Sequence, residues 1–186
     1  MTCSTGPDGA RSVFVAQAVG DQHILAGFDC GKPELDLWLR DSARHAERHR
    51  TCRTFVWHTG DNAVVAYFSL AAHLIERAVL PRGLAHGAPT QIPAVLLARL
   101  ALDKTLHGQG LGGVLLADAL GRAVEAGLRI GVRFILVDAI DDQAAGFYRA
   151  HGFTPVPGDP HRLVRKASSI AADLGITSED GPIRPH

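Results

Sequence analysis

A glycine-rich loop between an apolar strand and a helix constrains the fold of this chain more than any other feature. Apolar residues at 97–102 predict the strand, 103–107 form a polar link, and 114–120 predict the helix. Four of the six positions between the link and the helix are glycine: Gly108, Gly110, Gly112 and Gly113. Glycine lets a ligand approach the backbone closely, and the first turn of a helix offers unpaired N–H groups at the positive end of its dipole. The segment therefore predicts an anion site, most suited to phosphate.

Two kinds of phosphate-binding loop match these glycines. Gly108-x-Gly110-x-x-Gly113 fits the dinucleotide fingerprint, but in that fold the glycines follow their strand at once, near the start of the unit. Here the polar link intervenes, and about half of the chain comes first. His107, Gly110 and Gly112 instead resemble the acyl-CoA pyrophosphate loop of the GNAT N-acetyltransferase superfamily, with histidine in place of the usual arginine or glutamine. A tight strand-to-helix turn without a ligand is the third interpretation.

Composition indicates one globular domain. The chain has 186 residues, of which 46% are hydrophobic, and its formal net charge is zero. That length is enough to bury a core, and no apolar run approaches the 18 residues of a membrane span. The first residues lack the pattern of a signal peptide, and three cysteines without metal-type spacing are typical of free thiols. We therefore expect a cytoplasmic protein, and zero net charge argues against a general nucleic-acid coat protein.

The order of predicted elements indicates a mixed α/β fold with much antiparallel pairing. We expect a tail at 1–11, a single domain at 12–166 and a second tail at 167–186. Within the domain the patterns predict strands at 12–19, 54–57, 63–70, 97–102, 133–138, 153–155 and 162–165. They predict one or two helices over 33–48, a helix after the glycine loop, and another at 142–151. A loop rich in proline and glycine spans 80–93.

A second motif lies in the helix predicted at 142–151. Ala144, Tyr148, Gly152 and Phe153 resemble the Ala-x-x-x-Tyr-x-x-x-Gly-Phe block of GNAT enzymes, whose tyrosine commonly lies near the thioester sulfur. Transfer from a thioester to an amine requires an acid for the departing thiolate, and a phenol with a pKa of about 10 can donate that proton. The resemblance therefore implies that Tyr148 is catalytic. The alternative is a half-buried tyrosine that only packs on the sheet.

The same resemblance implies which residues hold the cofactor, acetyl-CoA. The strand at 100–102 corresponds to the strand whose backbone binds the pantetheine arm and, through an N–H group, the thioester oxygen. Asp141 stands where many GNAT enzymes have asparagine near that arm. The expected cofactor-binding residues are Leu100, Ala101, Leu102, His107, Gly108, Gln109, Gly110, Leu111, Gly112, Gly113, Asp141 and Phe147. The implied fold is the GNAT fold, a mixed and largely antiparallel twisted sheet flanked by helices.

Further segments resemble one branch of that superfamily, the acetyltransferase toxins of bacterial toxin–antitoxin pairs. They are 28–31, 35–36, 38–39, 53–56, 67–72, 80–81, 93–103 and 148–153, so that the resemblance spans about residues 12 to 166. Such toxins acetylate the α-amine of the amino acid on charged tRNA and thereby block translation. The resemblance implies aminoacyl-tRNA as substrate, a ribbon-helix-helix antitoxin as partner and a homodimer.

A stripe of arginines agrees with a tRNA substrate. Arg40, Arg44 and Arg48 are spaced by four residues and so share one face of the predicted helix, at a small cost from like-charge repulsion that a phosphate backbone would offset. Arg53 extends this face, and Arg99 is a further candidate for the tRNA end. A solvated face whose arginines pair with nearby carboxylates explains the pattern equally well.

Other chemistries remain as alternatives or are excluded. The chain could acetylate a small amine or a protein N-terminus, or it could be a non-catalytic CoA-binding module. His45 and His49 have the spacing of metal ligands on a helix, but no third ligand is evident, so we expect no metal site. The sequence contains neither a Gly-x-Ser-x-Gly elbow nor a Walker-type Gly-Lys-Ser/Thr. No general base is obvious; Asp103 and Asp138 are candidates by position alone.

Overall fold

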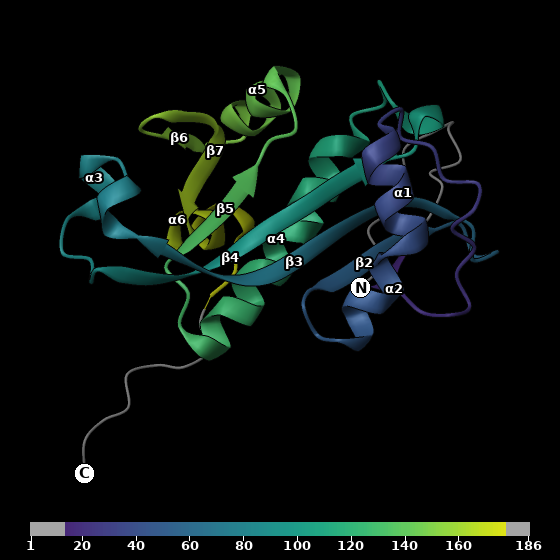
Figure 1. The fold of residues 1–186 in the computed structure, drawn as a ribbon, viewed down its shortest axis with the longest axis horizontal. Coiled ribbons are helices and arrows are strands. Elements are labelled where there is room, and N and C mark those ends of the chain that lie inside the picture. Colours follow the sequence, from purple (N-terminus) through teal and green to yellow (C-terminus); the bar gives the residue numbers. More distant parts are fainter. Residues whose placement is uncertain (1–13, 178–186) are drawn as a thin grey trace, which may run out of the picture.

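A computed structural model describes residues 14–177, which form one twisted sheet with helices on both faces (Figure 1). The strands are β1 (Val15–Ala18), β2 (Arg53–His58), β3 (Val64–Glu76), β4 (Gln91–Leu102), β5 (Phe134–Asp138), β6 (Thr154–Val156) and β7 (Asp159–Lys166). The α-helices are α1 (Pro33–Asp41), α2 (Ala43–Arg48), α3 (Arg82–Ala85), α4 (Leu111–Ile130), α5 (Asp142–Ala150) and α6 (Ala167–Leu174). Two short 3₁₀ turns are η1 (Arg77–Val79) and η2 (Lys104–Leu106).

The strand order is β1-β2-β3-β4-β5-β7-β6, and every neighbouring pair except β4–β5 is antiparallel. The predicted mixed α/β architecture with a largely antiparallel sheet is therefore confirmed. Within residues 14–177 we find no helix of the length and apolar character needed to cross a membrane.

Alternation along β3 explains why both faces of the sheet carry helices. Ala66 and Phe68 are buried in the cluster that contains the apolar face of α4, whereas Tyr67 between them is buried in the cluster that contains Leu39 of α1. Successive side chains of a strand point to opposite faces, so this run of apolar residues requires a cover on each side. Figure 1 shows α1 and α2 in front of the sheet and α4 behind it.

The sheet opens between its two central strands. The parallel pairing of β4 with β5 runs only from Ala94–Phe134 to Leu97–Val137. On the other edge of β4, Ser69 of β3 pairs with Arg99 and the next residue of β3 pairs with Leu97, which leaves Ala98 as an extra residue in β4. Such a bulge bends a strand and increases its twist. β4 then continues to Leu102 with a partner strand on its β3 side alone, so a cleft opens toward β5.

Some elements are longer than the sequence predicts. β3 extends to Glu76 and β4 begins at Gln91, so that the two strands form a long arm with α3 at its end. Ala167–Leu174 lies in the segment expected to be a tail but forms α6 on α4, because Ala167 and Ile170 bury their side chains in the core. The predicted tail at 1–11 and residues 178–186 lie outside the described residues.

A buried pair of histidines ties β1 to β2. Gly20 N donates to His23 Nδ1 at 2.9 Å and Gly60 N donates to His58 Nδ1 at 3.1 Å. The Nε2 atoms of both rings lie 2.8 and 2.9 Å from the side-chain amide of Gln17. Because the Nδ1 atom of His23 accepts a hydrogen bond from Gly20 N, the ring would lose this bond if it took up a second proton. Burial, reinforced by the nearby His58 and Arg44, lowers the pKa of His23.

We expect acidification to destabilise the protein through His23. The unfolded chain takes up a proton near pH 6.5, whereas the folded state does so only at lower pH. The free energy of unfolding therefore falls below about pH 6.5, by up to about 1.4 kcal/mol per unit of pKa difference. Thermal melting between about pH 7.5 and about pH 5.5 should show a smaller loss for His23→Gln than for the wild type. The variant His86→Gln, which removes an exposed imidazole, should retain the wild-type slope; equal slopes for all three proteins would contradict this role.

Candidate active site

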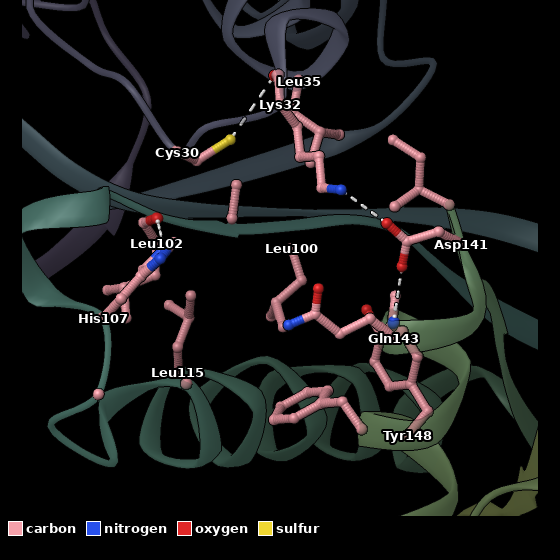
Figure 2. Close-up of a pocket in the computed structure, with 16 residues that line it drawn as sticks. Cys30, Lys32, Leu35, Leu100, Leu102, His107, Leu115, Asp141, Gln143 and Tyr148 are labelled. Atoms are coloured by element: carbon pink, nitrogen blue, oxygen red, sulfur yellow. Dashed lines mark hydrogen bonds and ion pairs between the residues drawn. The ribbon is translucent and has the colours of Figure 1, made fainter.

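The cleft beside β4 holds a cavity of about 410 Å³. β4 and the first turns of α4 form one side, α5 another, and the segment that leads into α1 closes it from above (Figure 2). The structure brings nine of the predicted site residues together in its wall: Leu100, Ala101, Leu102, His107, Gly108, Gly112, Asp141, Phe147 and Tyr148. The other predicted loop residues, Gln109, Gly110, Leu111 and Gly113, lie in the same loop and first turn but outside the cavity wall.

The glycine loop has the geometry of an anion cradle. Gly108 and Gly110 adopt φ values of +76° and +75°, a region that favours glycine, and a Cβ atom on either would meet open space. Gly110 is the N-cap of the twenty-residue α4 and provides no side-chain cap. The N–H groups of the first turn therefore remain available to a ligand, and the helix dipole favours a negative one.

His107 braces this loop. Its Nε2 lies 2.8 Å from the carbonyl oxygen of Leu102, the last residue of β4. The side chain thus connects the loop to the end of the strand, while its backbone leads into Gly108. Because the binding groups of the loop are backbone N–H groups, histidine in place of arginine or glutamine leaves the cradle intact.

Tyr148 lies at the inner end of the cavity. Its ring packs edge-on against Phe147 and Phe153, with centroids 5.4 and 5.8 Å apart, and 7% of the residue is exposed. Burial raises the pKa of its phenol, so the hydroxyl keeps its proton at neutral pH. Among residues 14–177 its oxygen has no hydrogen-bond partner, although it is not sealed off within the protein. A protonated phenol beside an open cavity can act as a general acid.

An ion pair spans the mouth of the cavity. Lys32 Nζ, just before α1, lies 2.7 Å from Asp141 Oδ2, and the other carboxylate oxygen accepts from Ala144 N at 2.8 Å (Figure 2). Asp141 thereby caps the N-terminus of α5. The hydrogen bond from Lys32 lowers the pKa of Asp141, so its carboxylate stays charged at neutral pH.

The sequence prediction did not include seven further residues of the wall, which come from α1 and the segment before it, from α4, and from the start of α5 and the residue before its cap. These residues are Cys30, Lys32, Leu35, Leu115, Ile140, Gln143 and Ala144. Cys30 is the potential nucleophile among them, but burial, with a contribution from Asp36, raises the pKa of its thiol to about 12. A thiol with this pKa is not a nucleophile at neutral pH, so the cavity favours direct transfer over a cysteine-bound intermediate.

A second cavity of about 290 Å³ adjoins the first and shares Tyr148 with it. Leu35, Leu100, Ile140 and Ala144 also belong to both walls. Arg99 lines only the second cavity, and its guanidinium lies over the Trp38 ring, 4.0 Å from the ring centroid. Tyr148 therefore stands between two compartments, as a reaction between two substrates requires.

The predicted arginine stripe does not lie on one helix, because Arg40 belongs to α1 and Arg44 and Arg48 belong to α2. Arg40 and Arg48 are exposed, whereas Arg44 donates to the carbonyl oxygens of Gly20 and His23 at 3.2 and 2.5 Å. Arg53, on the neighbouring strand β2, pairs with Glu47 at 2.8 Å. Arg44 therefore stabilises the loop at residues 20–23 and is not free to contact a ligand.

The two histidines with metal-ligand spacing, His45 and His49, pack against each other with ring centroids 4.2 Å apart. Residues 14–177 contain no group of three potential metal ligands.

The first cavity and the glycine loop together fit acetyl-CoA. The loop provides unpaired N–H groups for a pyrophosphate, and the free edge of β4 can pair with the amide groups of a pantetheine arm. Leu100, Leu115 and Phe147 give this channel apolar walls that lead to Tyr148.

Comparisons with known proteins agree with this geometry. A tRNA-acetylating toxin of Mycobacterium tuberculosis is 36% identical over 84% of this chain and 94% of its own length. The solved structure of AtaT complexed with acetyl-methionyl-tRNAfMet has 30% identity and a TM-score of 0.80, over 87% of this chain and 99% of that one. A mutant AtaT toxin bound to the C-terminus of the antitoxin AtaR and acetyl-CoA has 28% identity and a TM-score of 0.75, over 87% and 98%. Residues 50–155 match the acetyltransferase (GNAT) domain, and the chain belongs to this family as an N-acetyltransferase that uses acetyl-CoA.

Proposed function

We propose that this protein is a toxin that acetylates the α-amine of aminoacyl-tRNA and so blocks translation. The observation that carries the proposal is the position of Tyr148 in the walls of both the cofactor cavity and a second, adjoining cavity. The related tRNA-acetylating toxin and the complex of AtaT with acetyl-methionyl-tRNAfMet support the choice of substrate. Charged tRNA is a cytoplasmic substrate, so we also propose the cytoplasm as the site of action.

The proposed mechanism is direct transfer within the cleft. Acetyl-CoA, when bound, supplies the acetyl group as a thioester. Backbone N–H groups of the free β4 edge, near Leu100, would face the thioester oxygen and stabilise the negative charge that develops there. Tyr148 would donate its proton to the departing thiolate. An α-amine with a pKa of about 8 or below is partly neutral at pH 7, so it requires little activation.

The cofactor contacts are proposed for the residues that the cavity and loop bring together. The backbone from Gly108 to Gly113 would hold the pyrophosphate, and residues 100–102 would hold the pantetheine arm. Asp141 and Phe147 would flank the pantetheine arm on the side of α5. Each assignment rests on the placement of these groups around one channel.

We further propose that the exposed arginines of α1 and α2 contact the tRNA backbone. Arg40 and Arg48 are exposed, Arg53 lies on the adjacent strand, and Arg44 supports the loop beneath them. Arg99 lines the second cavity, where the charged end of the tRNA would enter. An antitoxin partner belongs to the same proposal and is supported by the complex of AtaT with AtaR. We also propose that this antitoxin is of the ribbon-helix-helix type and that the toxin is a homodimer, as the family resemblance implies.

The decisive experiment is transfer of labelled acetyl from acetyl-CoA to a pool of charged tRNA, with uncharged tRNA as the control. We expect label on the charged pool alone. If the protein binds acetyl-CoA but labels neither pool, the tRNA proposal is wrong, and a small amine, a protein N-terminus or a non-catalytic role takes its place.

Replacement of Arg40 and Arg48 together by alanine should weaken the use of charged tRNA. Each lost phosphate contact makes the plot of log binding constant against log salt concentration shallower by about one unit. For the double variant we therefore expect a slope shallower by about two, and transfer to charged tRNA about tenfold slower at low salt. Acetyl-CoA affinity should not change. The control is the double replacement of Arg82 and Arg129, which are also exposed but lie on other elements. Equal losses in both doubles would contradict a specific tRNA face.

A further inference from the structure

A glutamate at the start of α1 faces the second compartment. Glu34 follows Pro33 in the first turn of α1 and lines the 290 Å³ cavity together with Tyr148. Among residues 14–177 its carboxylate makes no hydrogen bond or ion pair with another protein group, so it can take an external cation. Glu34 belongs to none of the motifs of the sequence.

The other carboxylates near the reaction centre are engaged. Both oxygens of Asp138 accept from the Arg162 guanidinium, at 2.7 and 2.8 Å. Asp141 is occupied by Lys32 and by the N-terminus of α5. Asp103 accepts from the backbone N–H groups of Asp29 and Thr105 and lines neither of the two cavities. Of these acids, Glu34 is the one that combines a free carboxylate with a place beside Tyr148.

We propose that Glu34 binds the acceptor ammonium group on the side of Tyr148 opposite the cofactor, and takes its first proton. This role rests on the proposed function, because an aminoacyl ester supplies the ammonium. The charged groups around this position are consistent with it: Arg99 comes from β4, where Trp38 holds it, and Asp138 comes from β5, where Arg162 neutralises it.

The protons balance along this route. One N–H proton passes to Glu34 and then to solvent, which frees the nitrogen lone pair for attack on the thioester carbonyl carbon. As the C–N bond forms and the C–S bond breaks, Tyr148 gives its proton to the thiolate. The nitrogen loses its second proton to the phenolate, so Tyr148 ends protonated, and the products are an amide, a free thiol and one released proton.

A purely structural role for Glu34 gives a different result. A carboxylate in the first turn of a helix is favourable toward the helix dipole, so its loss would lower the melting temperature and would affect activity by the same factor at every pH. An ammonium-binding carboxylate matters most where the amine is protonated, and matters little where it is already neutral. The pH profile therefore separates the two roles.

The test compares Glu34→Gln with the wild type in acetyl transfer to charged tRNA at saturating acetyl-CoA. We expect a loss of about tenfold near pH 6.5 and of less than about twofold near pH 8.5. The control is Asp41→Asn, which removes one exposed carboxylate from the far end of the same helix and should match the wild type at both pH values. Acetyl-CoA affinity, measured for every variant, shows that the cofactor site is intact.

The outcomes distinguish this proposal from the proposed function. A wild-type protein that leaves charged tRNA unlabelled overturns the substrate, and the role of Glu34 with it. An active wild type with a Glu34→Gln variant that is equally active, or equally impaired at both pH values, overturns only the role of Glu34. A loss confined to low pH supports both.

Discussion

Replacement of Tyr148 by phenylalanine should reduce acetyl transfer by at least about a hundredfold, since a positioned general acid contributes roughly 10²–10⁴ to a rate. The ring remains, so its packing against Phe147 and Phe153 should hold the fold and the cavity. Steady-state transfer to charged tRNA measures the loss, and calorimetric titration with acetyl-CoA should show an affinity within about twofold of the wild type.

The second buried tyrosine provides a matched control. The hydroxyl of Tyr67 donates to the carbonyl oxygen of Leu35 at 2.9 Å and lines neither cavity. Its replacement by phenylalanine should cost about 1 kcal/mol of stability through one lost hydrogen bond and should leave most of the activity. If Tyr148→Phe turned over as fast as Tyr67→Phe, the acid would have to be another group or water, and Tyr148 would have only a packing role.

The cofactor loop could be predicted from sequence because its signal is local. The apolar run, the polar link and the glycines lie within seventeen consecutive residues, and each has a direct conformational meaning. The structure confirms the strand, the loop and the helix, and gives Gly108 and Gly110 the positive φ values that only glycine adopts readily. Tyr148 was predicted as the acid from the resemblance of residues 144–153 to a family motif, and the structure places it in α5, with Gly152 and Phe153 just beyond the end of the helix.

The rest of the site could not be predicted, because it comes from contacts between distant segments. Lys32 and Asp141 are 109 residues apart, and no local pattern indicates that they meet across the cavity mouth. Glu34 looks in sequence like an ordinary first-turn acid, and its place beside Tyr148 depends on how α1 packs over the sheet. For Arg44 the sequence predicts a role that the structure does not give it. Its spacing suggests a phosphate contact, whereas its guanidinium donates hydrogen bonds to backbone carbonyl oxygens.

The bulge in β4 is a further feature without a sequence signal. Ala98 is an ordinary small apolar residue in an apolar run, yet it is the extra residue at the point where β4 leaves β5. The divergence frees the β4 edge from strand pairing, and this edge borders both cavities. The catalytic arrangement thus depends on a backbone irregularity, which propensity and periodicity do not report.

A comparison of the two ends of α4 can separate a loss of cofactor binding from the effect of backbone strain. Gly110 caps the N-terminus and Gly131 caps the C-terminus, with φ values of +75° and +77°, and a Cβ atom would meet open space at either. Gly110→Asp should raise the dissociation constant for acetyl-CoA by about a hundredfold, because the new carboxylate would accept the first-turn N–H groups itself and repel the pyrophosphate. Gly131→Asp should leave that constant within about twofold. Calorimetric titration of acetyl-CoA measures both.

The variant with the weaker affinity for acetyl-CoA, Gly110→Asp, should be the more stable of the two. Both variants place a side chain in the left-handed region, at a cost of about 1 kcal/mol or somewhat more. At Gly110 the carboxylate would interact favourably with the positive end of the helix dipole, whereas at Gly131 it would face the negative end, so Gly131→Asp should melt at the lower temperature. A variant that is the more stable of the two but binds acetyl-CoA far more weakly cannot have lost affinity through general unfolding. If instead both variants lost affinity in proportion to their melting temperatures, the glycines would serve the fold of α4 alone, and the pyrophosphate would have to be held elsewhere.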